Sequence, residues 1–242
     1  MAVLWAIAFA ICPQRPGHSL FLGGQQMPIE ARMAGMFAGF VMAGVYGWIA
    51  GRGRAMRLPG LAITLTLIGF IALMGVDGMN AFLFDLRLPH LYAPNLLLRL
   101  ATGLLTGLAF AGFVIPAFNS TVWASGPDIS LLGGARDVLG ALLFEAVYFG
   151  LAVSGFGLLL YPVSLVAVLG FPILVVMIVS MVIAPILRRE NRAVRPADLF
   201  PLMLGSLLVA VMMLGLMSGF RYLLFGPGPL QMPMKAPVNA SK

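Results

Sequence analysis

The chain has 242 residues, of which 61% are hydrophobic and only 10% are charged, and its formal net charge is +7. A soluble domain carries about 25% charged residues, and no soluble fold of this size could hide so much apolar surface, so a water-soluble protein is excluded. The arginines lie in short loops between apolar runs rather than on a basic surface interleaved with aromatic residues, which argues against a nucleic-acid partner.

The apolar residues gather in runs of about 18 or more, the length that crosses about 30 Å of hydrocarbon at 1.5 Å per residue. We therefore predict an all-α fold, a polytopic transmembrane helix bundle. Residues 1–11 are apolar but too short to span, so we expect a short N-terminal helix or interfacial anchor there. Residues 12–32 form a polar hairpin punctuated by Gly and Pro, which must lie at a membrane face because lipid cannot satisfy its backbone.

About six full spans follow, at roughly 33–50, 60–77, 96–118, 133–158, 163–187 and 199–225. Tyr161-Pro162 is predicted to divide the apolar run 138–187 into two helices, because proline lacks an N–H and disfavours helical geometry at the preceding residue. The Pro-rich tail 226–242 has no means of burying itself, so we expect a partner to hold it.

The arginines predict the orientation of the bundle. Two loops, 51–58 and 188–197, hold most of them: Arg52, Arg54 and Arg57, then Arg188, Arg189, Arg192 and Arg195. Both loops fall on one side of the predicted topology, and the positive-inside rule makes that side cytoplasmic. We expect a multi-pass protein of the bacterial inner membrane with the hairpin on the outer side.

Small residues recur every four positions on three of the predicted helices. The stripes are Gly35, Gly39, Ala43 and Gly47; Gly103, Gly107 and Ala111; and Ala146, Gly150 and Ser154. Such stripes let helix backbones approach closely, which drives packing inside lipid. Helix packing is the favoured interpretation, and gating or dimerisation is the alternative.

Charged residues near the predicted outer face need partners, because an unpaired ion in the membrane costs several kcal/mol. Asp77 ends one span, Arg99 begins the next and Arg32 begins the first, so the three converge at one depth. We predict a structural polar cluster in which Asn95 caps the helix that carries Arg99, comprising Arg15, Glu30, Arg32, Asp77, Asn95 and Arg99. A substrate or ion site is the alternative.

Glu145 lies near the middle of a predicted span, one turn before Tyr148. An intramembrane acid can relay a proton, bind a cation or donate a hydrogen bond to a buried lipid, quinone or pigment, but a second mid-membrane charge is lacking, so we favour a structural role. His18 and His90 fall in outer loops, where loop histidines usually face solvent; ligation of haem or bacteriochlorophyll is the alternative. Signatures of haem attachment, metalloproteases, NTPases and α/β-hydrolases are absent, and we expect no enzyme activity.

Two stretches resemble a known family. The segment CPQRPGHSLFLGGQQMPIEARMAGMFAGF resembles the signature hairpin of the bacterial membrane-protein family called domain of unknown function 2085. GVDGMNAF, followed by NLLLRLATGLLTGLAFAGF, resembles that family's second stretch, with matches at Asp77-Gly78, Asn95, Arg99, Gly103 and Gly107. The resemblance covers about residues 10–118, which implies a family-like domain at 1–118 and three further transmembrane helices at 119–225.

The departures from the family pattern concern a set of thiols and an imidazole that could bind metal or form a disulfide. The resemblance implies Cys-His-Gln followed by Cys-x-Arg-Cys-x-Gly; here Cys12 and Gln14 remain, but Pro13, Glu30 and Met33 replace the histidine and the later cysteines. Zinc needs three or four ligands, and Cys12, His18 and Glu30 would be an improvised set. We expect the scaffold to survive without any metal chemistry.

These features predict a non-catalytic accessory subunit of a larger bacterial membrane complex, such as a respiratory or photosynthetic electron-transport complex. Its partners would be other integral membrane subunits and lipids, and a lipid, quinone or bacteriochlorophyll could be bound. The alternative is a small transporter or channel that uses Glu145 and the Asp77/Arg99 cluster. A membrane enzyme with Asp77, His18 or Glu30 as acid–base groups is the least favoured hypothesis, since no nucleophile–base spacing is recognisable.

Overall fold

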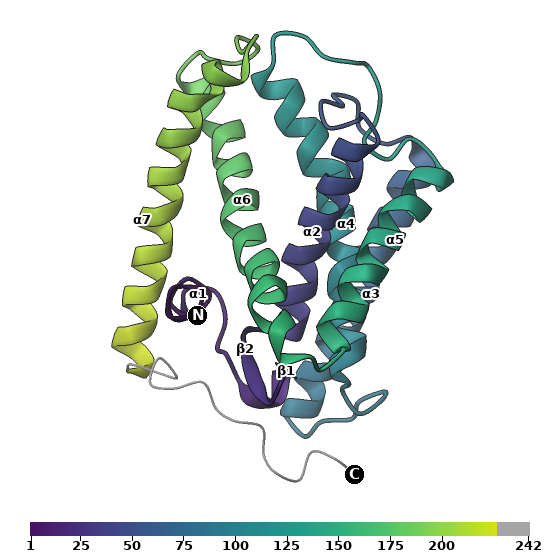
Figure 1. The fold of residues 1–242 in the computed structure, drawn as a ribbon, viewed down its shortest axis with the longest axis vertical. Coiled ribbons are helices and arrows are strands. Elements are labelled where there is room, and N and C mark those ends of the chain that lie inside the picture. Colours follow the sequence, from purple (N-terminus) through teal and green to yellow (C-terminus); the bar gives the residue numbers. More distant parts are fainter. Residues whose placement is uncertain (227–242) are drawn as a thin grey trace.

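A computed structural model describes residues 1–226, so all but the first residue of the Pro-rich tail lies outside the described residues. Figure 1 shows long helices running side by side, with a short helix and a two-stranded hairpin at one end of the bundle. The elements, in chain order, are α1 (Ala2–Phe9), β1 (Ser19–Leu22), β2 (Gln25–Glu30), α2 (Ala31–Ile49), α3 (Leu61–Asp85), α4 (Leu96–Val122), α5 (Ala135–Val153), α6 (Leu160–Ile186) and α7 (Phe200–Phe225). The predicted all-α membrane bundle is confirmed.

Four of these helical segments are long and apolar enough to cross a membrane unaided: Leu61–Asp85, Leu96–Val122, Gly157–Ile186 and Pro196–Leu224. The other two long helices, α2 and α5, have 19 residues each, which is roughly 28 Å at 1.5 Å per residue. They carry charges such as Arg32 and Glu145, and α2 packs against α4, α5 and α6. A helix that its neighbours cover need not be uniformly apolar. The predicted spans therefore correspond to six long helices: four that are apolar enough to cross a membrane unaided, and α2 and α5, which are less apolar.

The two ends of the bundle differ in chemistry. The hairpin and the α3–α4 and α5–α6 connections lie at one end, hereafter the hairpin end, and loops 51–58 and 188–197 lie at the other, the arginine-loop end (Figure 1). Loop 51–58 is fixed there by Asn119 of α4, whose Nδ2 donates to the carbonyl oxygens of Gly53 at 3.0 Å and Ala55 at 2.9 Å. Both arginine loops therefore share one end, as the sequence predicts.

Two helix boundaries differ from the prediction. Helix α3 continues to Asp85, so Asp77 lies inside the helix rather than at its end. The break between α5 and α6 falls at Ser154 and at Gly155, whose φ is +74°, a left-handed conformation that glycine adopts without steric cost. Pro162 is accommodated in the first turn of α6, where its missing N–H would have no helical acceptor. The predicted break at Tyr161-Pro162 is therefore wrong in position.

The polar hairpin is a short antiparallel sheet. Gly23 and Gly24 both have positive φ, +57° and +74°, which is the requirement of a tight two-residue turn. Leu22, Met27 and Ile29 are fully buried, and the hairpin packs against α1, α5 and α6. The segment therefore closes the end of the bundle with its own apolar face, rather than lying on the bundle as a solvated loop.

The closest helix contact joins α2 and α4, and glycine makes it. A Cβ on Gly35 or Gly39 would come under 3.0 Å from the carbonyl oxygens of Leu100 or Leu104, and one on Gly103 or Gly107 would meet the backbone of α2 in the same way. Each helix therefore uses two glycines to admit the backbone of the other.

The other predicted packing glycines behave differently. A Cβ on Gly47 would overlap the side chain of Leu131, a loop residue, so Gly47 seats a loop against α2 rather than a second helix. Gly150 is exposed, and nothing lies within 4 Å of the position that its Cβ would occupy. The stripe on α5 is therefore not a seam within this bundle.

We expect Gly107→Ala to destabilise the protein by about 1–3 kcal/mol, because the added methyl group must push α2 and α4 apart. Gly150→Ala is the matched control: it has open space and gains helix propensity. Thermal unfolding in detergent, followed by circular dichroism, measures both. Equal unfolding temperatures for the two variants would contradict the contact described here.

Candidate functional site

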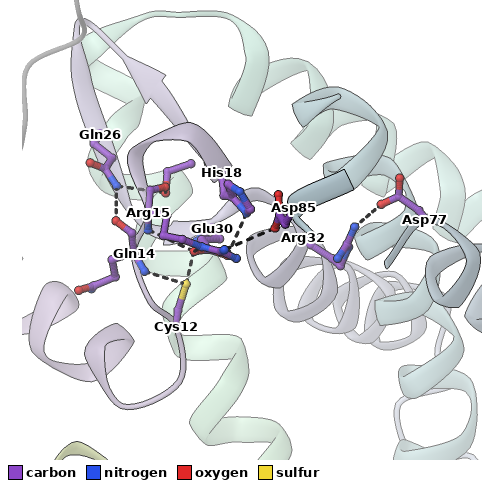
Figure 2. Close-up of polar contacts among 10 residues, drawn as sticks. Cys12, Gln14, Arg15, His18, Gln26, Glu30, Arg32, Asp77 and Asp85 are labelled. Carbon is purple, nitrogen blue, oxygen red and sulfur yellow. Dashed lines mark hydrogen bonds and ion pairs between the residues drawn. The ribbon is translucent and has the colours of Figure 1, made fainter. Parts of the chain in front are cut away.

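Polar side chains gather at the hairpin end in two layers, one inside the hairpin and one between the hairpin and the helices (Figure 2). The inner layer consists of Cys12, Gln14, Ser19 and Gln26. The second layer, hereafter the hairpin-end cluster, consists of Arg15, His18, Glu30, Arg32, Asp77, Asp85, Tyr92 and Arg99.

The inner layer satisfies the backbone of the segment that leads into the hairpin. The Nε2 of Gln14 donates to the carbonyl oxygens of Trp5 at 3.0 Å and Pro28 at 2.9 Å. The Nε2 of Gln26 donates to the carbonyl oxygen of Gln14 at 2.9 Å and to Ser19 Oγ at 3.1 Å. Buried backbone groups without such partners would be costly, so these amides serve the fold.

Cys12 is fully buried, and its Sγ accepts the backbone N–H groups of Gln14 at 3.5 Å and Glu30 at 3.3 Å. Burial, reinforced by the nearby charge of Glu30, raises the pKa of this thiol to about 11. A thiol is nucleophilic and binds metal as the thiolate, which this environment disfavours.

Arg15 joins the hairpin to the end of α3. Its Nε lies 3.1 Å from Glu30 Oε1, its backbone N–H donates to the same oxygen, and its Nη1 lies 3.6 Å from Asp85 Oδ2. His18 Nδ1 lies 3.8 Å from the other oxygen of Glu30. Burial and the charges of Arg99 and Arg15 lower the pKa of His18 below its usual value of 6.5, so this histidine is neutral at pH 7.

A second set of contacts joins α2, α3 and the α3–α4 loop. Arg32 Nη2 is paired with Asp77 Oδ2, and the Tyr92 hydroxyl donates to Asp77 Oδ1 at 2.8 Å. Burial and this hydrogen bond raise the pKa of Tyr92. Asn80, one turn after Asp77, accepts the backbone N–H groups of Leu91 at 2.7 Å and Tyr92 at 3.2 Å. Because α3 continues past Asp77, these side chains reach the loop that follows it.

Asn95 and Arg99 lie at the start of α4. Asn95 is the N-cap, and its side chain accepts the N–H of Leu97 at 2.7 Å. Arg99 lies one turn later; it is only 5% exposed, and its Nε is buried without a hydrogen-bond partner in the described part of the chain. The structure thus brings together five of the six predicted cluster residues and places Asn95 beside them as a cap.

A pocket of about 240 Å³ lies within the hairpin-end cluster. Its polar walls are Arg15, Arg32, Arg99 and His18 with the carboxylates of Glu30 and Asp85, and Gly78, Ala81 and Phe82 of α3 form an apolar wall.

Glu145 lies elsewhere, at the crossing of α2 and α4. It is 3% exposed, and its Oε1 lies against Gly39 and has no hydrogen-bond partner among residues 1–226. Tyr148, one turn later, donates its hydroxyl hydrogen to the carbonyl oxygen of Val163 at 3.1 Å and so makes no hydrogen bond to Glu145.

The two histidines occupy unlike environments. His90 is exposed in the α3–α4 loop and packs edge-on against Phe84, while His18 faces Glu30. Within residues 1–226, no three His, Cys, Asp or Glu side chains are grouped as metal ligands would be. The set of Cys12, His18 and Glu30 fails because the Cys12 sulfur is directed at backbone N–H groups.

Several residues of this end were not singled out in the sequence, among them Asn80, Asp85 and Tyr92. Arg221 of α7 is another: its Nη1 donates to the carbonyl oxygens of Phe9 and Cys12 at 2.6 Å each, and its guanidinium lies 4.8 Å from the centre of the Phe9 ring. An arginine near the end of an apolar helix is the only signal that could have indicated it.

Residues 12–113 match the family described as "Predicted membrane protein (DUF2085)". This match confirms the family inferred from the two sequence stretches. No curated protein and no solved structure matches the chain. The matched region runs from the hairpin into α4 and contains the whole hairpin-end cluster, while α5, α6 and α7 lie beyond it.

We expect Cys12 to resist alkylation by N-ethylmaleimide in the folded protein at pH 8, because the thiol is buried and its pKa is raised to about 11. Cys12 is the chain's single cysteine, so intact mass reports the reaction without ambiguity. The same protein unfolded in detergent should react completely. Rapid labelling of the folded protein at pH 8 would contradict the buried position.

Proposed function

We propose that this chain, whose residues 12–113 form a domain of the DUF2085 family of membrane proteins, is a non-catalytic accessory subunit of a larger membrane complex. The main observation that supports this proposal is the exposure of α3. Only 11% of the most apolar stretch of α3 is buried, against 67% for α4, and α3 packs chiefly against α4.

One stripe of small residues, among the larger apolar side chains exposed on α3, favours a protein neighbour over lipid. Ala62, Thr66, Gly69 and Ala72 are all exposed, and nothing lies within 4 Å of the position of a Cβ on Gly69 or Gly75. Small residues gain little from contact with lipid chains, whereas they let a second helix approach closely.

The chemistry of the hairpin supports the same function. Cys12, His18, Glu30 and Asp77 are groups that could act as nucleophile, acid or base, and each contacts other groups of the chain itself. Cys12 accepts backbone N–H groups, Glu30 is held by Arg15, and Asp77 is held by Arg32 and Tyr92. These contacts stabilise the hairpin end and leave the apolar helix faces for interaction with partners.

We expect Gly69→Leu to remove most of the partner chains that co-purify with the protein in mild detergent, because the leucine occupies the space that a partner helix would need. Gly215→Leu on α7 is the matched control, since Gly215 is also exposed with nothing within 4 Å. Mass spectrometry of the co-purifying chains, with the unfolding temperature of each variant, measures the effect. Isolation of the unaltered chain alone, or identical partners with both variants, would contradict the proposal.

A transporter or channel is the second candidate, and Glu145 is the observation that favours it. A buried carboxyl group with an unpartnered oxygen inside a membrane bundle is a functional candidate by default. Tyr148 and the backbone glycines beside Glu145 do not satisfy that oxygen in this structure.

Under the accessory-subunit proposal, Glu145→Gln should assemble normally and be at least as stable as the unaltered chain, because the amide keeps the shape of the carboxyl group and carries no charge. Co-purification and thermal unfolding measure this. Loss of proton or cation flux in reconstituted vesicles, with assembly intact, would favour the transporter instead.

A further inference from the structure

The charges of the hairpin-end cluster balance in number, with three arginines against Glu30, Asp77 and Asp85, but they do not balance in contact. Arg15 contacts both Glu30 and Asp85, and Arg32 contacts Asp77. Arg99 is only 5% exposed, and it makes no ion pair with any residue of the described chain. A buried ion without a partner costs several kcal/mol, so this position calls for an anion.

Two arginines that line the pocket are incompletely paired. Arg99 and Arg32 each have a buried Nε without a hydrogen-bond partner in the described chain, and the pair of Arg32 with Asp77 uses only Nη2. Gly78 adjoins Arg32, with Nη1 of Arg32 3.5 Å from the position that a Cβ on Gly78 would occupy. Two incompletely paired guanidinium groups therefore line the pocket, and Gly78 leaves room beside one of them.

Glu30, Asp77 and Asp85 lie near enough to attract the charge of Arg99, but none of them forms an ion pair with it. Asp85 follows Gly78 by two helical turns, roughly 10 Å along α3, and its side chain is 39% exposed, so water screens its charge. Glu30 accepts both the backbone N–H and the Nε of Arg15. Burial lowers the pKa of His18, and the nearby charges of Arg99 and Arg15 lower it further.

The volume limits the size of the occupant. About 240 Å³ is roughly eight times the 30 Å³ that one water occupies in the liquid. Pockets for drug-sized molecules and cofactors measure about 300–1,000 Å³, so this smaller pocket suits a small group better than a whole cofactor. It accommodates a small anionic group with its hydrating water.

We propose that the pocket between Arg32, Arg99 and Gly78 binds a phosphate group. A carboxylate offers two oxygens, which one guanidinium can saturate, whereas a phosphate offers enough oxygens to accept from two. This site is independent of the accessory-subunit proposal, since it lies on the other side of α3 from the exposed small residues.

The phosphate can belong to a lipid headgroup or be free in solution. Phe82 lines the pocket and is 58% exposed near the end of an apolar helix, the depth at which a phospholipid headgroup would lie. Inorganic phosphate would reach the same donors from the aqueous phase.

The test is the unfolding temperature of the purified full chain in a phosphate-free detergent. In one arm, inorganic phosphate is titrated against chloride at constant ionic strength; in the other, phosphatidylglycerol in mixed micelles is compared with a neutral galactolipid that lacks phosphate. We expect a rise of about 5 °C or more near saturation in at least one arm. A response to inorganic phosphate alone identifies a free anion, and a response confined to phosphatidylglycerol identifies a headgroup.

Arg99→Gln separates a binding site from a structural clamp. We expect it to unfold at a higher temperature than the unaltered chain without ligand, because the unpaired buried charge is gone, and to lose the response to phosphate. Arg87→Gln, an exposed arginine of the neighbouring loop, should keep the response. Gly78→Leu, which fills the pocket wall and leaves every charge in place, should also lose it.

Three results would overturn the proposal. One is the absence of any shift in both arms with the unaltered chain. Another is a shift that persists in both Arg99→Gln and Gly78→Leu, and the last is an equal loss of the shift in Arg87→Gln, which would mark a general effect of surface charge.

Discussion

The close crossing of α2 and α4 determines where the other polar groups of this protein lie. The first turn of α2 carries Arg32 and the first turn of α4 carries Arg99, and a Cβ on Gly103 would overlap the carbonyl oxygen of Arg32. Glycine contact therefore brings two helix starts with like charges to the same depth. Asp77 enters from α3 to pair with Arg32, and the hairpin closes over the cluster. The glycine contact between α2 and α4 therefore determines both the packing of these helices and the position of the charged residues at their starts.

The hairpin illustrates how a polar segment can end a membrane bundle without a solvated loop. Lipid offers no hydrogen bonds, so every buried donor and acceptor must find a partner within the protein. Gln14 and Gln26 bind the backbone of their own segment, and Arg221 reaches from α7 to two carbonyl oxygens near Cys12. The arginine ties the last helix to the first twelve residues, so the two ends of the described chain stabilise each other.

The sequence predicted the depth of the cluster but not its contacts. Hydrophobic runs fix which residues lie near a membrane face, so the convergence of Asp77 and Arg99 followed from span boundaries, even though α3 continues past Asp77. The partners Tyr92 and Gln14 could not be predicted, because each binds groups whose positions depend on how the chain folds around them. The prediction of a helix break at Pro162 was wrong for a local reason. Proline is tolerated in the first turn of a helix, and α6 begins at Leu160, so Pro162 lies in that turn.

Arg99 is placed where three separate effects oppose a positive charge. It is buried; it lies near Arg32, which is also positive; and it lies one turn from the N-terminus of α4, the positive end of the helix dipole. The acids of the cluster do not offset these effects by contact, because each is held by another group. Packing alone would be served as well by a neutral side chain of similar length. An anion in the pocket offsets these effects, because Arg99, Arg32 and the helix N-terminus all attract it and burial strengthens that attraction.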